Sequence, residues 1–113
     1  MPHRPLPRTE SDTLVHDATA GMPRLLEIMA RLRAADGCAW DIEQTFASIA
    51  PYTLEEAHEV VDAIERQAWD ELKGELGDLL LQSVFHAQIA EEEGLFAFED
   101  VVASISDKMV ARH

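Results

Sequence analysis

The chain has 113 residues, enough for one domain, and its 22 acidic against 9 basic residues give a formal charge of −13 at neutral pH. This excess argues against duplex nucleic acid and anionic membranes as partners, but not against a phosphorylated small molecule, because bound Mg²⁺ reverses the local field of a carboxylate cluster. The single cysteine, Cys38, excludes an internal disulfide and fits a reducing cytoplasm.

The N-terminal part is rich in proline, arginine, serine and threonine without a sustained period, so we predict a flexible leader over residues 1–17. Residues 18–113 are expected to form one helical domain. Its first helix is predicted to begin near residues 20–22, because Pro23 is tolerated only in a first turn, and to end near Ala35. The last residues read as helix without a stop signal, so we expect this domain to be part of a longer chain.

Two signals follow this helix. Asp41 and Gln44 have the spacing of a capping box, which predicts a short helix over 42–49 that ends before Pro51. Trp40 comes just before that cap. One interpretation places its indole in the core, and the other makes it an aromatic wall for a flat ligand such as a nucleobase.

A longer helix is predicted over 54–67, with Thr53 at its N-cap. At about 100° per residue, Glu56 and Glu59 are neighbours that lean toward the apolar side, whereas Glu55 faces water. A carboxylate in the interior is costly unless it has a partner, so a partner is implied. For Glu56 a structural alternative stays open, because Thr53 and Glu56 also match the Thr-x-x-Glu capping box.

The next helix is predicted over 70–92, antiparallel to the previous one because the connection between them is short. Its middle is apolar nearly all round, which is typical of a helix at the centre of a bundle. Glu75 and Asp78 lie on one stripe of this helix, so we expect that stripe to face protein rather than bulk water. A last helix is predicted from near Phe98 and carries a basic pair, Lys108 and Arg112, at i, i+4 spacing.

Inward carboxylates from two antiparallel helices suit Mg²⁺, with Mn²⁺ as a substitute, because both ions prefer oxygen ligands. Mg²⁺ also commonly shares its coordination shell with substrate phosphates. Zinc does not fit, since Cys38 stands alone and the histidines do not cluster at ligand spacing. A di-iron site is disfavoured as well, because the Glu-x-x-His motif at 55–58 has no second copy.

At these residues the sequence resembles a known family. The motif Glu55-Glu56-x-x-Glu59, followed by Glu75-x-x-Asp78, is similar to the signature of the MazG-type nucleoside triphosphate pyrophosphohydrolases, an all-α superfamily shared with dimeric dUTPases. Further runs that look like the N-terminal MazG domain lie at 39–45, 52–56 and 105–108. The resemblance covers about residues 22–113 and leaves the leader outside.

The resemblance implies an all-α antiparallel helical bundle, completed by dimerisation, that hydrolyses nucleoside triphosphates to the monophosphate and pyrophosphate. Such a reaction would serve housecleaning of cytoplasmic nucleotide pools. The implied Mg²⁺ ligands are Glu56, Glu59, Glu75 and Asp78. The resemblance implies that Glu55 assists as a general base. It also implies that Lys108 and Arg112 bind the substrate phosphates and that Trp40 contacts the nucleobase. The alternative is a non-catalytic, metal-binding dimerisation or regulatory module of a longer MazG protein.

Overall fold

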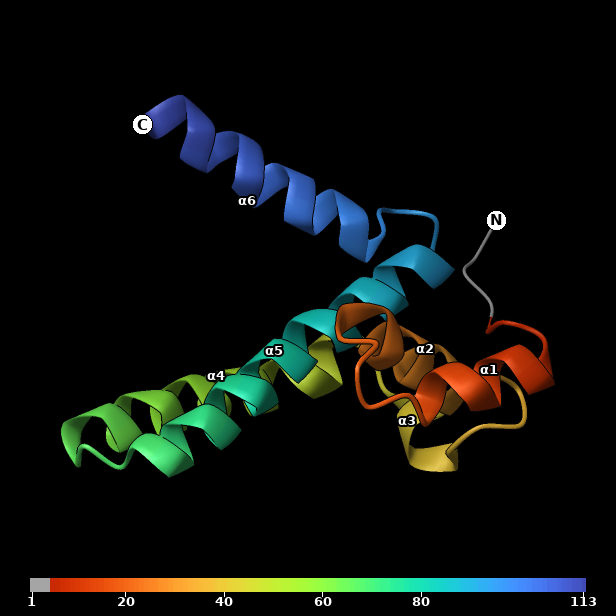
Figure 1. Cartoon of the computed structure of the whole chain (residues 1–113), viewed down its shortest axis with the longest axis horizontal. Coiled ribbons are helices and arrows are strands. Elements are labelled where there is room, and N and C mark those ends of the chain that lie inside the picture. The colour runs from red at the N-terminus through yellow and green to blue at the C-terminus, as the bar shows by residue number, and fades with distance from the viewer. Residues whose placement is uncertain (1–4) are drawn as a thin grey trace.

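The computed structural model describes residues 5–113, which form six helices and no strand (Figure 1). The helices are α1 (Arg8–Val15), α2 (Met22–Leu32), α3 (Ala39–Glu43), α4 (Phe46–Glu65), α5 (Trp69–Glu92) and α6 (Phe98–Arg112). The predicted all-α fold is therefore confirmed. Within the described residues, no helix combines the length and the apolarity needed to cross a membrane.

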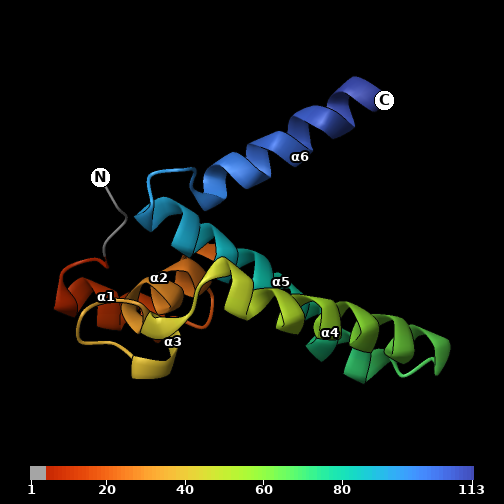
Figure 2. The same cartoon turned by 180° about the vertical axis from the view of Figure 1, so that it is seen from behind.

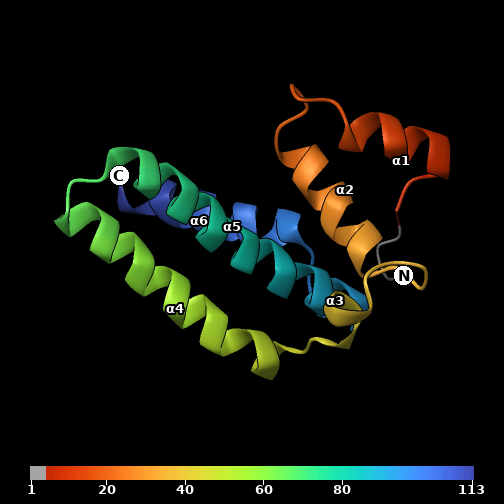
Figure 3. The same cartoon turned by 90° about the horizontal axis from the view of Figure 1, so that it is seen from below.

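The core lies at one end of a long antiparallel hairpin formed by α4 and α5 (Figures 2 and 3). The buried residues of the main apolar cluster come from α2, α4 and the second half of α5: Met29, Ile49, Val84, Phe85 and Ile89. The first half of α5 contributes no buried residue, so this part of the hairpin projects from the core. The start of α6 packs against the end of α5, with Phe98 on the core, and the later turns of α6 run away from the hairpin (Figure 1).

α1 lies where the sequence predicts a flexible leader. This helix packs against α2, where Arg31 forms an ion pair with Asp12 at 2.5 Å and Ser11 is only 1% exposed. The prediction of an irregular leader is therefore wrong for residues 8–15, while residues 1–4 lie outside the described part. Two turns are too short to show a clear apolar period, and so short a helix depends on tertiary contacts that the sequence does not show.

α4 runs without interruption through Pro51, where the sequence predicts a break. The helix begins after Thr45, whose side chain accepts a hydrogen bond from the Ser48 N–H (3.1 Å), while the Ser48 hydroxyl accepts one from the Thr45 N–H (2.8 Å). The predicted helix over 42–49 and the predicted N-cap at Thr53 are both wrong. Pro51 is tolerated because it lies in the second turn, where the bond it cannot donate would go to the carbonyl of the exposed Ala47.

The other helix boundaries lie close to the predicted ones. α2 begins at Met22 with Pro23 in its first turn, as predicted, but ends at Leu32, about one turn early. α5 ends at a left-handed Gly94 with a φ of 73°, and the Leu95 N–H reaches back to the carbonyl of Ala90 at 2.9 Å.

The buried guanidinium of Arg33 joins three segments near the core. Its side chain is 8% exposed and donates two hydrogen bonds of 2.9 Å each to the carboxylate of Glu92 at the end of α5. It also donates to the carbonyls of Asp41 (2.6 Å) and Gln44 (3.1 Å), which lie at the end of α3. The chain from the end of α2 to the start of α4 is thereby fastened to α5.

The turn between α4 and α5 contains a left-handed residue that is not glycine. Gln67 has a φ of 55°, a conformation that costs an L-residue about 1 kcal/mol more than glycine. We expect Gln67→Gly to raise the free energy of unfolding, measured by urea denaturation, by up to about 1 kcal/mol. Gln67→Ala is the control, because alanine keeps the Cβ that causes the strain. Equal stabilisation by both changes would contradict this explanation.

Candidate metal and substrate site

Three carboxylates meet between α4 and α5. Glu56 of α4 and Glu75 and Asp78 of α5 each offer an oxygen, and these oxygens lie within 4.8 Å of one another. Glu75 and Asp78 share a face of α5 because residues three apart are neighbours on a helix. The antiparallel hairpin then places Glu56 opposite them. We call these three residues the carboxylate cluster.

Glu56 lies in an environment that disfavours its ionised form. Burial and the negative charges of Asp78 and Glu75 raise its pKa above the ordinary value. Its Oε2 atom is buried and has no hydrogen-bond partner among the described residues. A buried carboxylate oxygen without a donor is costly, so this site favours a proton or a cation. An all-oxygen donor set of this kind fits a hard divalent cation.

The structure also decides between the two interpretations of Glu56. Because α4 begins at Phe46, Glu56 lies in the helix interior, far from the first turn. The Thr53–Glu56 capping box is therefore absent, and the structural alternative for Glu56 is excluded.

Replacing Glu56 by glutamine is expected to stabilise the metal-free protein at neutral pH. Because the folded-state pKa of Glu56 is raised, its stabilising protonation is complete below the ordinary value of 4.5 and is lost as the pH rises through the raised pKa. Glu56→Gln removes this penalty, so its free energy of unfolding at pH 7 in EDTA should exceed that of the wild type and depend less on pH between 5 and 7. Urea denaturation measures both. The matched control is Glu65→Gln, at an exposed position of the same helix; a penalty of equal size there would contradict a specific effect at Glu56.

The remaining predicted metal-site residues lie outside this cluster. Glu59, the fourth predicted ligand, is exposed and is not among the carboxylates that come within 4.8 Å. Glu55 is exposed, as the helical wheel predicts. Their proposed roles stay predictions.

The predicted substrate contacts are not brought to the cluster by a single chain. Lys108 and Arg112 are exposed on the later turns of α6, the part that runs away from the hairpin (Figure 1). Trp40 is 49% exposed and meets Tyr52 and Phe85 edge-on, with ring centroids 6.0 and 6.5 Å apart. The indole is thus neither a core plug nor isolated, and it leaves one side open toward solvent.

A polar group next to the cluster was not predicted. The Thr53 hydroxyl oxygen lies 3.0 Å from Nε2 of His86 and 3.1 Å from Oε1 of Gln82. The ring of His86 stacks on Phe46 at 5.9 Å, and burial lowers the pKa of His86. The sequence signal is the i, i+4 spacing of Gln82 and His86 on the stripe of Asp78. Assigning Thr53 to a cap concealed its role as their partner.

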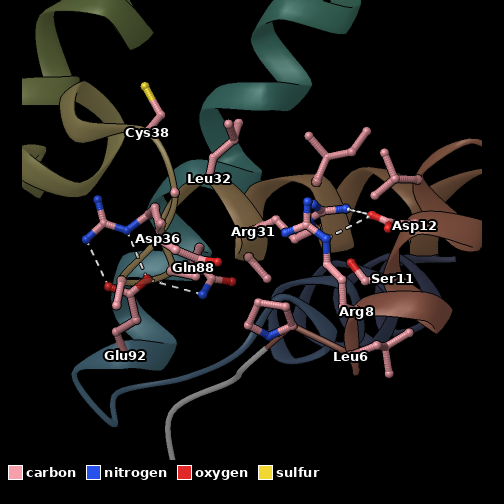
Figure 4. Close-up of a pocket in the computed structure, with 18 of the residues that line it drawn as sticks. Leu6, Arg8, Ser11, Asp12, Arg31, Leu32, Asp36, Cys38, Gln88 and Glu92 are labelled. Carbon is pink, nitrogen blue, oxygen red and sulfur yellow. Dashed lines mark hydrogen bonds and ion pairs between the residues drawn. The ribbon is translucent and has the colours of Figure 1, made fainter.

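A cavity of about 950 Å³ lies away from the carboxylate cluster, between α1, α2 and the end of α5 (Figure 4). Its wall contains three arginines that already have acidic partners: Arg8 and Arg31 pair with Asp12, and Arg33 pairs with Glu92. No residue of the carboxylate cluster lines this cavity, so the volume of a cavity does not by itself identify the candidate metal site.

Comparison with known proteins identifies the family. Residues 44–113 match the family model described as the MazG nucleotide pyrophosphohydrolase domain. The chain belongs to the MazG family. The resemblance inferred from the sequence motifs is therefore confirmed, and this family of metal-dependent hydrolases agrees with the acidic cluster of the structure.

Several relatives of this MazG domain are named after the reaction they catalyse. The chain is 65% identical over 91 residues to a nucleoside triphosphate pyrophosphohydrolase of Escherichia coli K12, covering 80% of the chain and 35% of the relative. It is 49% identical over 89 residues to the nucleoside triphosphate pyrophosphohydrolase/pyrophosphatase MazG of Thermotoga maritima, covering 79% and 35%. A nucleoside triphosphate pyrophosphohydrolase of Mycobacterium tuberculosis is 43% identical over 84 residues, covering 73% and 25%. The chain thus spans about a third or less of the length of these curated relatives.

Proposed function

We propose that this MazG domain hydrolyses nucleoside triphosphates to the monophosphate and pyrophosphate, with Mg²⁺ held by Glu56, Glu75 and Asp78. The observation that carries this proposal is the convergence of the three carboxylates around a buried, unpartnered oxygen of Glu56. A divalent cation supplies charge neutralisation and polarisation of phosphoryl oxygens, and Mn²⁺ would substitute for Mg²⁺. The names of the relatives support the substrate class and the reaction.

The two other glutamates of α4 have supporting roles in this proposal. Glu59 lies one turn from Glu56 on the same helix and is proposed to complete the ligand set when a cation draws it in. Glu55, exposed on the same helix next to Glu56, is proposed to accept a proton from the attacking water. The reaction would remove unwanted nucleotides from the cytoplasmic pool.

We also propose that the domain acts as a homodimer. The described chain exposes large apolar side chains along the projecting hairpin and along α6: Leu54, Val61, Leu76, Leu80, Val101, Val102, Ile105 and Met109. An apolar surface of this extent is typical of an interface. A second copy would cover it and bring Lys108 and Arg112 to the phosphates at a carboxylate cluster, while Trp40 would face the base.

Pyrophosphate release tests the proposal. A panel of ribonucleoside and deoxyribonucleoside triphosphates is incubated with the protein in Mg²⁺, in Mn²⁺ and in EDTA. We expect pyrophosphate and the monophosphate in equal amounts with either cation and none in EDTA. Binding of Mg²⁺ and dimerisation without any pyrophosphate release would instead support the non-catalytic module.

A further inference from the structure

Thr53, Gln82 and His86 form a polar layer between α4 and α5. Thr53 lies three residues before Glu56, and Gln82 lies four residues after Asp78, so the layer is one helical turn from the carboxylate cluster on the same faces. All three polar residues are partly buried. The apolar core begins directly beyond them, so the layer separates the cluster from that core.

The hydrogen bonds of this layer have a direction. The Thr53 hydroxyl carries a single proton, yet it lies within bonding distance of Gln82 Oε1 (3.1 Å) and His86 Nε2 (3.0 Å), and at a longer 3.4 Å from the carbonyl of Ile49. In one arrangement, Thr53 donates to Gln82 Oε1, and His86 in its Nε2–H tautomer donates to Thr53. Both bonds of Thr53 are then satisfied.

The opposite direction satisfies the same three groups. If the Gln82 carboxamide turns over, its nitrogen donates to Thr53, and Thr53 donates to an unprotonated Nε2 of His86. The amide oxygen and nitrogen have nearly the same shape, so packing is unchanged. Neutral His86 exists in either tautomer, and burial favours the neutral form by lowering its pKa.

The end of Gln82 that does not bond Thr53 is open to a ligand. Its amide nitrogen has no hydrogen-bond partner among the described residues and is not one of their buried, unpartnered atoms, so water reaches it. In the first direction Gln82 presents a donor, and in the second an acceptor.

We propose that Gln82 contacts the edge of the nucleobase and reads it through this reversible relay with Thr53 and His86. The inference rests on the function proposed above, which places the phosphates at the carboxylate cluster. Gln82 lies four residues, about 6 Å along the helix axis, from Asp78. It also lies toward Phe85, which Trp40 contacts edge-on, so the polar layer stands between the cluster and the aromatic group. A base that offers either a carbonyl or an amino group would find a complementary partner there.

A pair of substrates tests the relay. The bases of dCTP and dUTP differ at C4, where cytosine has an amino donor and uracil a carbonyl acceptor, and at N3, where cytosine has an acceptor and uracil an N–H donor. The relay is tested for a contact of Gln82 with the C4 group. Gln82→Glu keeps the shape and the bond from Thr53 but presents only an acceptor. We expect the ratio of kcat/KM for dCTP to that for dUTP to rise about tenfold or more over the wild type. The matched control, Ser83→Glu, adds the same charge at the next, exposed residue and should leave the ratio unchanged. An unchanged ratio in Gln82→Glu would overturn the proposal.

A measurement without nucleotide or metal examines the relay itself. The ¹⁵N shifts of the His86 ring report its tautomer, and we expect both tautomers in the wild type but chiefly the Nε2–H form in Gln82→Glu. If that variant does not fold, Thr53→Val breaks the relay while keeping the side-chain shape. It should raise KM for both nucleotides severalfold with kcat unchanged. Unchanged KM values, or a tautomer ratio that does not respond, would overturn the relay.

The two proposals fail in different ways. If the wild type releases no pyrophosphate, the proposed function fails, and the His86 tautomers alone decide on the relay. If the wild type is active but neither the base ratio nor the tautomers respond to these changes, only the relay fails.

Discussion

Asp78→Ala is expected to lower kcat for pyrophosphate release by at least about a hundredfold at saturating Mg²⁺. Asp78 is the exposed member of the carboxylate cluster, so its truncation removes a ligand without leaving a cavity in the core. The melting temperature of the metal-free variant should therefore equal or exceed that of the wild type, because one of three crowded negative charges is gone. The rise in melting temperature that Mg²⁺ produces in the wild type should shrink.

The matched control for this experiment is Asp70→Ala. Asp70 is an exposed aspartate in the first turn of the same helix, outside the cluster, so its loss should leave kcat near that of the wild type. Activity retained in Asp78→Ala would contradict the proposed site. The companion variant Glu59→Ala tests whether the fourth predicted ligand takes part. Loss of Glu59 should reduce activity only if its carboxylate coordinates the metal when the metal binds.

Ile105→Glu is expected to convert a dimer into a monomer. Ile105 is 50% exposed at the centre of the apolar side of α6, with Val101 and Met109 one turn away on either side. Burying one such side chain contributes about 1.5–3 kcal/mol, and a glutamate in its place would have to be desolvated. The dimer Kd should rise about a hundredfold or more, which sedimentation velocity over a concentration series measures.

This change should not unfold the single chain, because no residue of α6 is buried in it. Helix content by circular dichroism verifies this. The control is Ala103→Glu, which puts the same charge on the opposite side of α6. A wild type that stays monomeric at high concentration would contradict the proposed dimer. A dimer that survives Ile105→Glu would assign the interface to the hairpin instead.

Helices with a sustained apolar period were predicted well from the sequence. α5 and α6 lie within a residue or so of their predicted bounds, since Gly94 ends the first of them unambiguously. Pro51 misled the prediction because a proline reads as a stop unless the preceding cap is known. The true cap, Thr45 with Ser48, competes with the equally plausible pair Asp41 and Gln44, and only tertiary contacts choose between them.

The meeting of Glu56 with Glu75 and Asp78 was predictable, because helical wheels and a short antiparallel connection together fix which faces oppose each other. The exposure of the apolar side of α6 was not, since the sequence alone does not show that this side lacks a partner among the described residues. The pairing of Thr53 with Gln82 and His86 also escaped prediction, because it depends on the exact register between α4 and α5.

The fourfold use of the Arg33 guanidinium determines how the native chain opens. Apart from the short helix α3, residues 33–45 are irregular and would ordinarily exchange their amide hydrogens through small local fluctuations. Their tie to Glu92 means that freeing them leaves a buried cation without its partner, a change that costs several kcal/mol. We therefore expect this segment and the end of α5 to open as one cooperative unit, and the projecting tip of the hairpin to open independently. We thus expect the connection between α2 and α4 to exchange its amide hydrogens as slowly as the buried end of α5.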